Sequence, residues 1–146
     1  MDIVIDFDGT CVEHCFPEIG GDIGAVPVLK QLVAAGHRLI LFTMRCDNQA
    51  AAMLENGYIM HGGDFLKMAV DWFKTNDIPL FGIQRNPEQD IWTTSPKAYG
   101  QLIIDDAALG CPLIHPGDRR PYVNWEAIEA HLVFTGVLPS KKKNAK

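Results

Sequence analysis

The 146-residue sequence contains no stretch near the ~20 consecutive apolar residues that a membrane-spanning helix requires. It also lacks the charged leader and the apolar run of a signal peptide after Met1. We therefore expect a cytoplasmic protein with no membrane partner.

The sequence also lacks an excess of basic charge, because its formal net charge is −5. A broad basic face for duplex nucleic acid is therefore not expected, so nucleic acid is considered only as a substrate. The one dense basic run is 141–143, which we interpret as part of a solvated tail at 139–146. The preceding residues 1–138 are expected to form a single domain.

The sequence lacks cysteines at the spacing of a complete metal site. Cys11 and Cys15 flank His14, but no second pair completes a set of four zinc ligands. Cys46 and Cys111 stand alone. We expect reduced, unpaired thiols.

What the sequence does have is enough apolar surface for a core, since 47% of its residues are hydrophobic. Apolar runs predict strands, and apolar stripes at helical spacing predict helices. Strands alternating with helices favour an α/β fold with a parallel sheet and right-handed crossovers. The predicted strands are 3–5, 38–43, 80–83, 102–104 and 112–114, and the predicted helices are 25–35, 49–55, 64–75 and 124–136.

The first ten residues carry the strongest functional signal. Ile3-Val4-Ile5 reads as a strand buried on both faces, and it runs directly into Asp6-Phe7-Asp8-Gly9-Thr10. Two acids have no structural use at the end of a buried strand, whereas open α/β sheets place their ligands there. We therefore expect the chemistry at Asp6 and Asp8.

Two further strands end in polar residues, Thr43 in one case and Asp105-Asp106 in the other. Parallel strands bring these side chains to the same sheet edge as Asp6, and Lys97 lies in the loop before the 102–104 strand. Clustered carboxylates repel one another, and a hard cation with oxygen ligands relieves that repulsion. The pattern predicts a Mg²⁺ site.

Taken together, these residues resemble the four motifs of the haloacid dehalogenase (HAD) superfamily. The motifs are Asp6-Phe7-Asp8-Gly9-Thr10, Thr43 after an apolar strand, Lys97, and Asp105-Asp106, in the order in which the family has them. The resemblance implies a Rossmann-like three-layer sandwich with a central parallel sheet of strand order 5-4-1-2-3. It also implies a Mg²⁺-dependent phosphatase or phosphotransferase.

The resemblance assigns catalytic roles residue by residue. Asp6 is the nucleophile that forms an aspartyl-phosphate, and Asp8 is the general acid and base. Thr43 donates a hydrogen bond to the phosphoryl group, and Lys97 offsets negative charge there. Taken alone, Thr43 could simply end a strand and Lys97 could be a surface lysine.

The resemblance also assigns the Mg²⁺ ligands. They are the Asp6 carboxylate, the Asp8 backbone carbonyl and the Asp105 carboxylate, with Asp106 binding directly or through water. The resemblance leaves open whether Asp105 or Asp106 is the direct metal ligand.

No cap domain is expected, because residues 11–24 are too few and residues 44–96 are largely used by the core. An open site admits a small phosphorylated metabolite, a nucleotide or the phosphorylated end of a macromolecule, and a second subunit could cover it in an oligomer. Candidate substrate contacts are Gly9, His14, Met44 and Arg45, with Arg85 as a further guess. His14 could equally be an exposed loop histidine.

The leading hypothesis is therefore a Mg²⁺-dependent phosphomonoester hydrolase. A phosphotransferase of the same fold is an alternative, as is a non-catalytic phosphate-binding or receiver-like module. In a receiver domain the adjacent acid pair follows the first strand, whereas here Asp105-Asp106 comes last and Asp6-Phe7-Asp8 comes first. That order argues against a receiver-like module.

Overall fold

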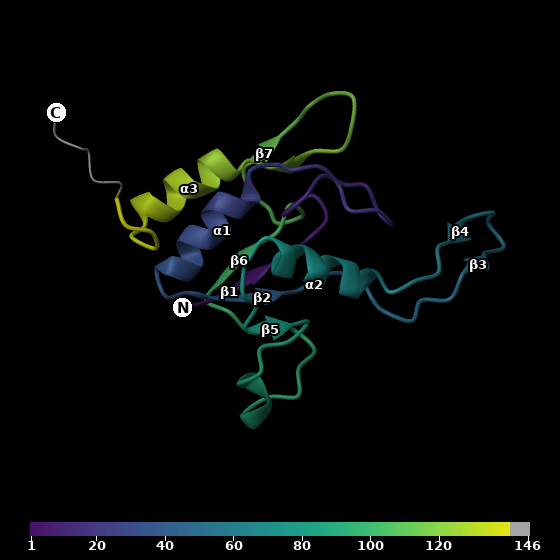
Figure 1. The fold of residues 1–146 in the computed structure, drawn as a ribbon, viewed down its shortest axis with the longest axis horizontal. Coiled ribbons are helices and arrows are strands. Elements are labelled where there is room, and N and C mark those ends of the chain that lie inside the picture. The colour runs from purple at the N-terminus through teal and green to yellow at the C-terminus, as the bar shows by residue number, and fades with distance from the viewer. Residues whose placement is uncertain (141–146) are drawn as a thin grey trace.

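A parallel sheet forms the centre of the protein in the computed structural model, which describes residues 1–140 (Figure 1). Its first strand, β1 (Asp2–Ile5), lies between β2 (Arg38–Leu41) and β6 (Leu102–Ile104). The short strand β5 (Gly82–Ile83) pairs with the far side of β2. The resulting order, β5-β2-β1-β6, confirms the α/β class and the predicted positions of the first four sheet strands.

The three α-helices pack on one face of the sheet. Alternate residues of β1, Ile3 and Ile5, point into this core and are fully buried. Phe7 continues the same face and contacts the ring of Phe73 with centroids 6.2 Å apart. The helices are α1 (Ala25–Ala34), α2 (Phe65–Thr75) and α3 (Trp125–Phe134).

The opposite face of the sheet is covered by an irregular segment instead of an α-helix. Val4 and Ile40 pack there against Ala98, in a cluster separate from the main core. The covering segment, residues 84–100, contains only the 3₁₀ turn η1 (Gln89–Ile91). The third layer of the expected sandwich is thus present but almost without regular structure.

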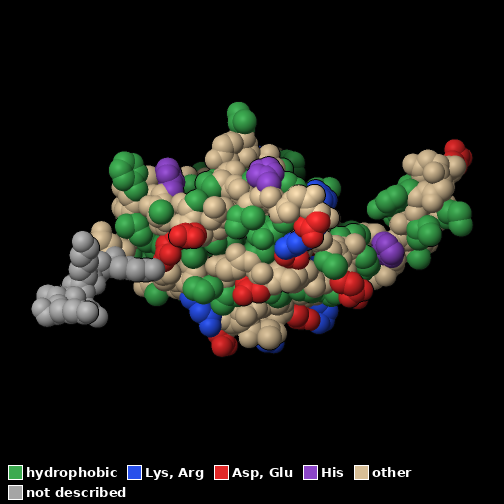
Figure 2. All heavy atoms as spheres, turned by 90° about the horizontal axis from the view of Figure 1, so that it is seen from above, with side chains coloured by type: hydrophobic (Ala, Val, Ile, Leu, Met, Phe, Trp, Pro, Cys, Tyr) green, Lys and Arg blue, Asp and Glu red, His purple; other side chains and the backbone are tan. Residues whose placement is uncertain are grey.

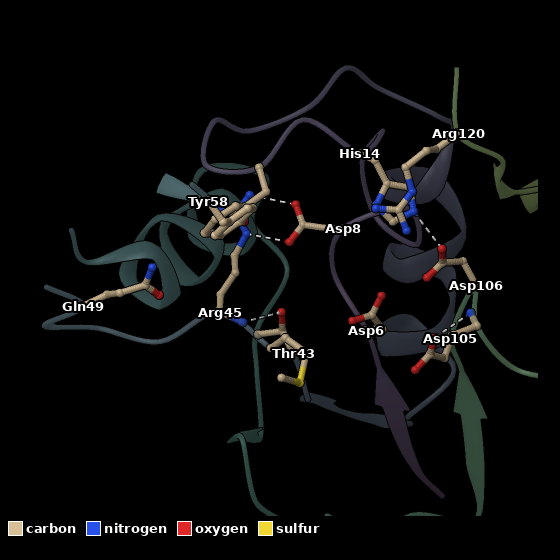
Figure 3. A pocket seen from close by; sticks show the side chains of 13 residues that line it. Asp6, Asp8, His14, Thr43, Arg45, Gln49, Tyr58, Asp105, Asp106 and Arg120 are labelled. Atoms are coloured by element: carbon tan, nitrogen blue, oxygen red, sulfur yellow. Dashed lines mark hydrogen bonds and ion pairs between the residues drawn. The ribbon is translucent and has the colours of Figure 1, made fainter. Parts of the chain in front are cut away.

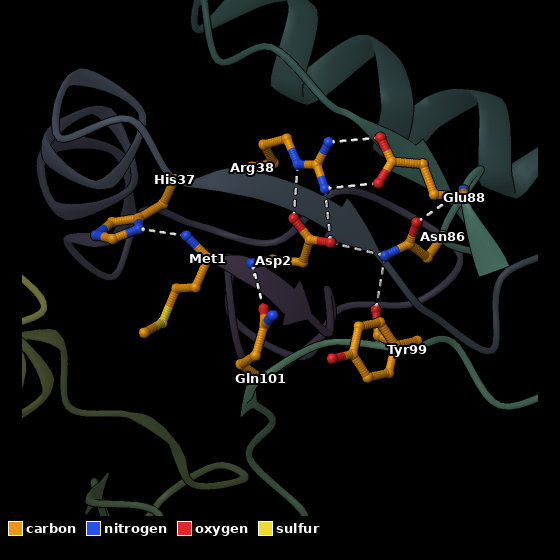
Figure 4. Close-up of polar contacts among 8 residues, drawn as sticks. All are labelled: Met1, Asp2, His37, Arg38, Asn86, Glu88, Tyr99 and Gln101. Atoms are coloured by element: carbon orange, nitrogen blue, oxygen red, sulfur yellow. Dashed lines mark hydrogen bonds and ion pairs between the residues drawn. The ribbon is translucent and has the colours of Figure 1, made fainter.

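A polar network holds this segment against the amino end of the sheet (Figure 4). Arg38 binds both carboxylate oxygens of Asp2, at 2.6 and 2.9 Å, and it also pairs with Glu88 at 2.8 Å. The buried Asn86 amide donates to Asp2 Oδ2 at 2.9 Å and to the carbonyl of Tyr99 at 3.2 Å. These contacts tie β1, β2 and the segment together.

The predicted helix at 49–55 is wrong, because this region forms an antiparallel hairpin. Its strands are β3 (Ala52–Met53) and β4 (Ile59–Met60), joined through the turn at Asn56-Gly57. Asn-Gly is a strong hairpin signal, and it overrides the helix propensity of the alanines before it. Residues 46–63, the β3–β4 arm, project from the body of the molecule and expose apolar side chains (Figures 1 and 2).

The predicted strand at 112–114 exists but does not join the central sheet. β7 (Leu113–Ile114) pairs antiparallel with β8 (Tyr122–Val123) in a separate hairpin. Residues 115–121 form the β7–β8 loop. The expected fifth position of the sheet is therefore not filled by this strand, and β6 is an edge strand among residues 1–140.

None of the helices within residues 1–140 is long and apolar enough to cross a membrane. The basic run predicted as a solvated tail, 141–143, lies outside the described residues. Between β2 and α2, the described chain carries the β3–β4 arm.

Candidate functional site

A cavity of about 520 Å³ lies at the carboxyl end of β1, where the sequence predicted the chemistry (Figure 3). Its lining combines the acidic residues that follow β1 and β6 with residues after β2 and from the two hairpins. The lining residues are Asp6, Asp8, His14, Phe16, Thr43, Met44, Arg45, Gln49, Tyr58, Asp105, Asp106, Ala107 and Arg120.

Asp6 lies at the centre of this cavity, directly after β1. Its backbone N–H extends the ladder to the carbonyl of Ile104 at 3.1 Å, which fixes it between the two strands. Burial, followed by the charges of Asp105 and Asp106, raises the pKa of the Asp6 carboxyl to about 7. The Phe7 backbone N–H and the Thr10 hydroxyl oppose this rise by stabilising the carboxylate.

Asp6, Asp105 and Asp106 together have the geometry of a cation site. One carboxylate oxygen from each lies within 4.8 Å of the other two. Mutual repulsion and burial both disfavour this arrangement for bare carboxylates, and a hard divalent cation relieves both. The donor set fits Mg²⁺, and these three residues would hold it. The side chain of Asp8 does not belong to this group.

The Asp106 side chain is held in place by two neighbours. His14 Nε2 lies 2.8 Å from Asp106 Oδ2, and both side chains are mostly buried. The Thr10 hydroxyl accepts the Asp106 backbone N–H at 3.0 Å and donates to Asp6 Oδ2 at 2.8 Å. His14, predicted as a substrate contact, thus holds the Asp106 carboxylate in place. Thr10 links Asp6, which follows β1, to Asp106, which follows β6. Thr10 was missed as a site residue although it stands in the first motif.

Gly9, also predicted as a substrate contact, makes the close approach of His14 possible. Its φ of +81° lies in the left-handed region. A Cβ at this position would lie 2.1 Å from His14 Nε2 and 2.6 Å from Asp106 Oδ2. Gly9 is buried and does not line the cavity, so its place in the structure is one of backbone shape.

Asp8 points toward the opposite wall, where a buried arginine holds it (Figure 3). Arg45 donates from Nε to Asp8 Oδ2 and from Nη2 to Asp8 Oδ1, both at 2.7 Å. Its other donors reach the carbonyls of Pro17 at 3.1 Å and Glu18 at 2.8 Å, and the residue is 2% exposed. Arg45 was predicted as a substrate contact, but its hydrogen bonds are made to the protein.

Thr43 and Met44 lie in the cavity wall as predicted. The Gln84 side chain accepts from the Thr43 N–H at 2.8 Å and donates to its carbonyl at 2.6 Å, which fixes the turn after β2. The Thr43 hydroxyl accepts from the Arg45 backbone N–H at 3.2 Å. Met44 is 97% exposed at the rim.

Lys97, predicted to join the acidic residues at the sheet edge, does not line the acidic cavity. It is exposed and lines a separate cavity of about 250 Å³ beside Trp92 and Tyr99. Its backbone carbonyl accepts from Gln89 at 3.0 Å, within the irregular segment that covers the far face of the sheet. Arg85, a further predicted contact, is also committed to this segment through Asp90 and the carbonyls of Thr93 and Ser95.

Sequence reasoning missed the residues that the two hairpins contribute. Tyr58 comes from the β3–β4 arm and Arg120 from the β7–β8 loop, and both line the cavity. Gln49 lies at the base of the arm, where its backbone pairs with Gly63. No local pattern identifies them, because their position depends on how the hairpins fold back toward the site.

The fold and site define a Rossmann-like α/β protein with a carboxylate-lined cavity at the carboxyl edge of its sheet. Among solved structures, the chain is similar to a conserved protein from Bacteroides thetaiotaomicron. The two are 29% identical, with a TM-score of 0.64 over 93% of this chain and 90% of that chain. Neither a protein-family model nor a curated protein sequence matches the chain.

Proposed function

We propose that the protein is a Mg²⁺-dependent phosphomonoester hydrolase of the HAD type, working through an aspartyl-phosphate on Asp6. The observation that carries this proposal is the position of Asp6. One of its oxygens belongs to the three-carboxylate cation site, and the side chain also lines the open cavity beside Asp8. A nucleophilic carboxylate needs both a cation beside it and room for the phosphoryl group.

In the first step, an Asp6 oxygen attacks phosphorus in line. The new bond joins this oxygen to phosphorus, and the bond from phosphorus to the leaving-group oxygen breaks. Asp8 gives a proton to that oxygen. Mg²⁺ held by Asp6, Asp105 and Asp106 would offset the negative charge that gathers on the phosphoryl oxygens.

In the second step, a water attacks the phosphorus of the aspartyl-phosphate and Asp8 takes up its proton. The bond between phosphorus and Asp6 breaks, which releases phosphate and restores the carboxylate. Arg45 holds Asp8 through both oxygens, but each carboxylate oxygen has a second lone pair with which to accept a proton. We expect Arg45 to fix the direction from which Asp8 acts.

The test is phosphate release from a chromogenic phosphomonoester and from a panel of phosphorylated metabolites, nucleotides and oligonucleotide ends. Release should require Mg²⁺, stop with a chelator and be abolished by Asp6→Asn. Asp71→Asn, an exposed acid on α2, is the matched control and should retain activity. Wild-type protein that is inert with Mg²⁺ across the whole panel would contradict the proposal.

A further inference from the structure

A phosphoryl group bound beside this acidic cluster needs a positively charged side chain from the protein. Lys97 does not line the cavity and does not supply this charge. Asp6, Asp8, Asp105 and Asp106 all face the cavity, so its electrostatic environment opposes an incoming phosphate. The arginine and lysine residues lining the cavity are Arg45 and Arg120. The choice therefore lies between these two arginines.

Arg45 is fully engaged by the protein. Its guanidinium holds both oxygens of Asp8 and two backbone carbonyls, and its side chain is 1% exposed. It also lies over the rings of Phe7 and Phe16, at 5.2 and 5.1 Å from their centroids. Contacting a ligand would require Arg45 to break a buried ion pair, which is costly.

Arg120 is the opposite case. It is exposed, and within residues 1–140 its guanidinium makes no hydrogen bond or ion pair. Its neighbour Arg119, by contrast, pairs with Glu13 at 3.1 Å and with Asp118 at 3.0 Å. Figure 3 shows the Arg120 side chain reaching from the β7–β8 loop toward the side of the cavity formed by His14 and Asp106.

The loop that carries Arg120 is fixed to the site at several points. β7 and β8 pair with each other, the Val123 N–H donates to the Gly9 carbonyl at 2.9 Å, and Arg119 reaches Glu13. The loop therefore presents Arg120 to the cavity from an anchored base. A planar guanidinium offers paired donors that match two phosphate oxygens.

We propose that Arg120 binds the phosphoryl oxygens of the substrate, taking the role that the resemblance to the HAD motifs implied for Lys97. This inference rests on the proposed phosphatase function, and it identifies a substrate-binding residue supplied by the β7–β8 loop. The same contact binds inorganic phosphate, the product of the reaction, in the Mg²⁺-loaded protein.

The experiment compares Arg120→Ala, Arg120→Lys and Lys97→Ala in two assays with Mg²⁺ present. The first is kcat/KM for a phosphomonoester that wild-type protein hydrolyses, and the second is inorganic phosphate binding by titration calorimetry. Arg120→Ala should lower kcat/KM by about 100-fold and weaken phosphate binding, because a charge-assisted contact to the reacting group is lost. Arg120→Lys should recover part of both, and Lys97→Ala should change neither.

The two assays separate failure of this inference from failure of the proposed function. If wild-type protein releases phosphate and Arg120→Ala matches it in both assays, the inference is overturned and the phosphatase function stands. A larger loss in Lys97→Ala than in Arg120→Ala also overturns the inference. If phosphate binding depends on Arg120 but no substrate is turned over, the binding role stands and the hydrolase function falls. Wild-type protein that neither binds phosphate nor hydrolyses any substrate overturns both.

Discussion

At the scale of single residues, the candidate site depends on contacts between its members as much as on its carboxylates. His14 and Thr10 position Asp106, Thr10 also hydrogen-bonds Asp6, and Arg45 holds Asp8. None of these three partners needs to touch a substrate to matter. Polar groups around metal-binding carboxylates orient them in this way, and changing such a group often weakens metal binding.

Gly9→Ala tests the close packing of His14 and Asp106 against the backbone of Gly9. The added Cβ meets His14 and Asp106 at distances no real Cβ tolerates, in addition to the strain of a positive φ. Gly36→Ala is the matched control, since Gly36 has φ +85° but no atom near the added Cβ. We expect Gly36→Ala to cost about 1 kcal/mol in urea unfolding and Gly9→Ala about 2 kcal/mol more. Equal losses would contradict the close approach.

Arg45→Met tests the ion pair that holds Asp8. It leaves a mostly buried carboxylate and two carbonyls without their donor, so we expect the free energy of unfolding to fall by about 3 kcal/mol. Activity should fall as well, because Asp8 loses its fixed direction. The double variant Arg45→Met with Asp8→Asn should recover part of the stability in denaturant unfolding. Additive losses in the double variant would show that the two side chains do not interact.

At the scale of elements, the two hairpins distinguish this site from a bare sheet edge. The β3–β4 arm contributes Tyr58, and the β7–β8 hairpin contributes Arg120. The arm strands have only two residues each, and Met53, Tyr58 and Ile59 are 76%, 58% and 60% exposed. An isolated hairpin of this kind adds little to global stability. Its contribution is to the wall of the cavity.

Replacing residues 51–61 with an Asn-Gly turn tests whether the arm contributes to the cavity wall and not to stability. The pairing of Gln49 with Gly63 remains, so the shortened loop can close on it. We expect the free energy of unfolding to stay within about 0.5 kcal/mol of wild type, while KM rises because Tyr58 is lost. Tyr58→Ala alone should reproduce the KM increase, and Ile59→Ser, on the same arm but outside the cavity lining, should not. A large loss of stability would place the arm in the core.

The sequence predicts the acidic part of the site because that part is local. Asp6 and Asp105 each follow an apolar run, and parallel strands bring such ends together wherever the loops go. The positively charged side chain of the site could not be found in this way. Choosing Lys97 assumed that the segment before β6 returns to the carboxyl edge. Instead, a long-range hydrogen bond from Asn86 to Asp2 holds that segment at the amino end of the sheet, and Gln89 folds it on itself through Ser95 and Tyr99.

The two hairpins were not predicted from the sequence for a related reason. The alanine-rich run at 50–52 favours a helix by propensity, and the Asn56-Gly57 turn that decides against it reads equally well as a helix stop. The β7–β8 pairing forms outside the main sheet, so Arg120 reaches the cavity through tertiary structure alone.

At the scale of the whole molecule, the two ends of the sheet serve different purposes. The carboxyl end gathers repelling carboxylates in a cavity, an arrangement that by itself disfavours folding. The amino end carries the opposite arrangement, in which Asp2 is ion-paired and hydrogen-bonded by Arg38 and Asn86. The Asp2 network thus stabilises the sheet at the edge away from the acidic cavity.

Acid unfolding tests the amino-end network. Hydrogen bonds from Arg38, followed by that from Asn86, hold the pKa of Asp2 below its usual value of 3.8, against an opposing effect of burial. The folded state therefore binds fewer protons than the unfolded state in this range. The resulting stability is present above pH 3.8 and is lost as the pH falls further, through the lowered folded pKa.

We expect Asp2→Asn to remove that part of the pH dependence, measured as the free energy of unfolding in denaturant at several pH values below about 5. Asp71→Asn on the surface of α2 should leave the profile like that of wild type. A profile for Asp2→Asn that falls as steeply as the wild-type profile would mean that other groups account for it.

The most direct test of the account is a search for the covalent intermediate on Asp6. Protein mixed with Mg²⁺ and a hydrolysable phosphomonoester is quenched in acid, digested and analysed by mass spectrometry. We predict a phosphoryl group on the peptide carrying Asp6, more abundant in Asp8→Asn because the water is no longer activated, and missing in Asp6→Asn and with a chelator. Phosphate release by wild-type protein with no adduct on Asp6, even in Asp8→Asn, would contradict the account.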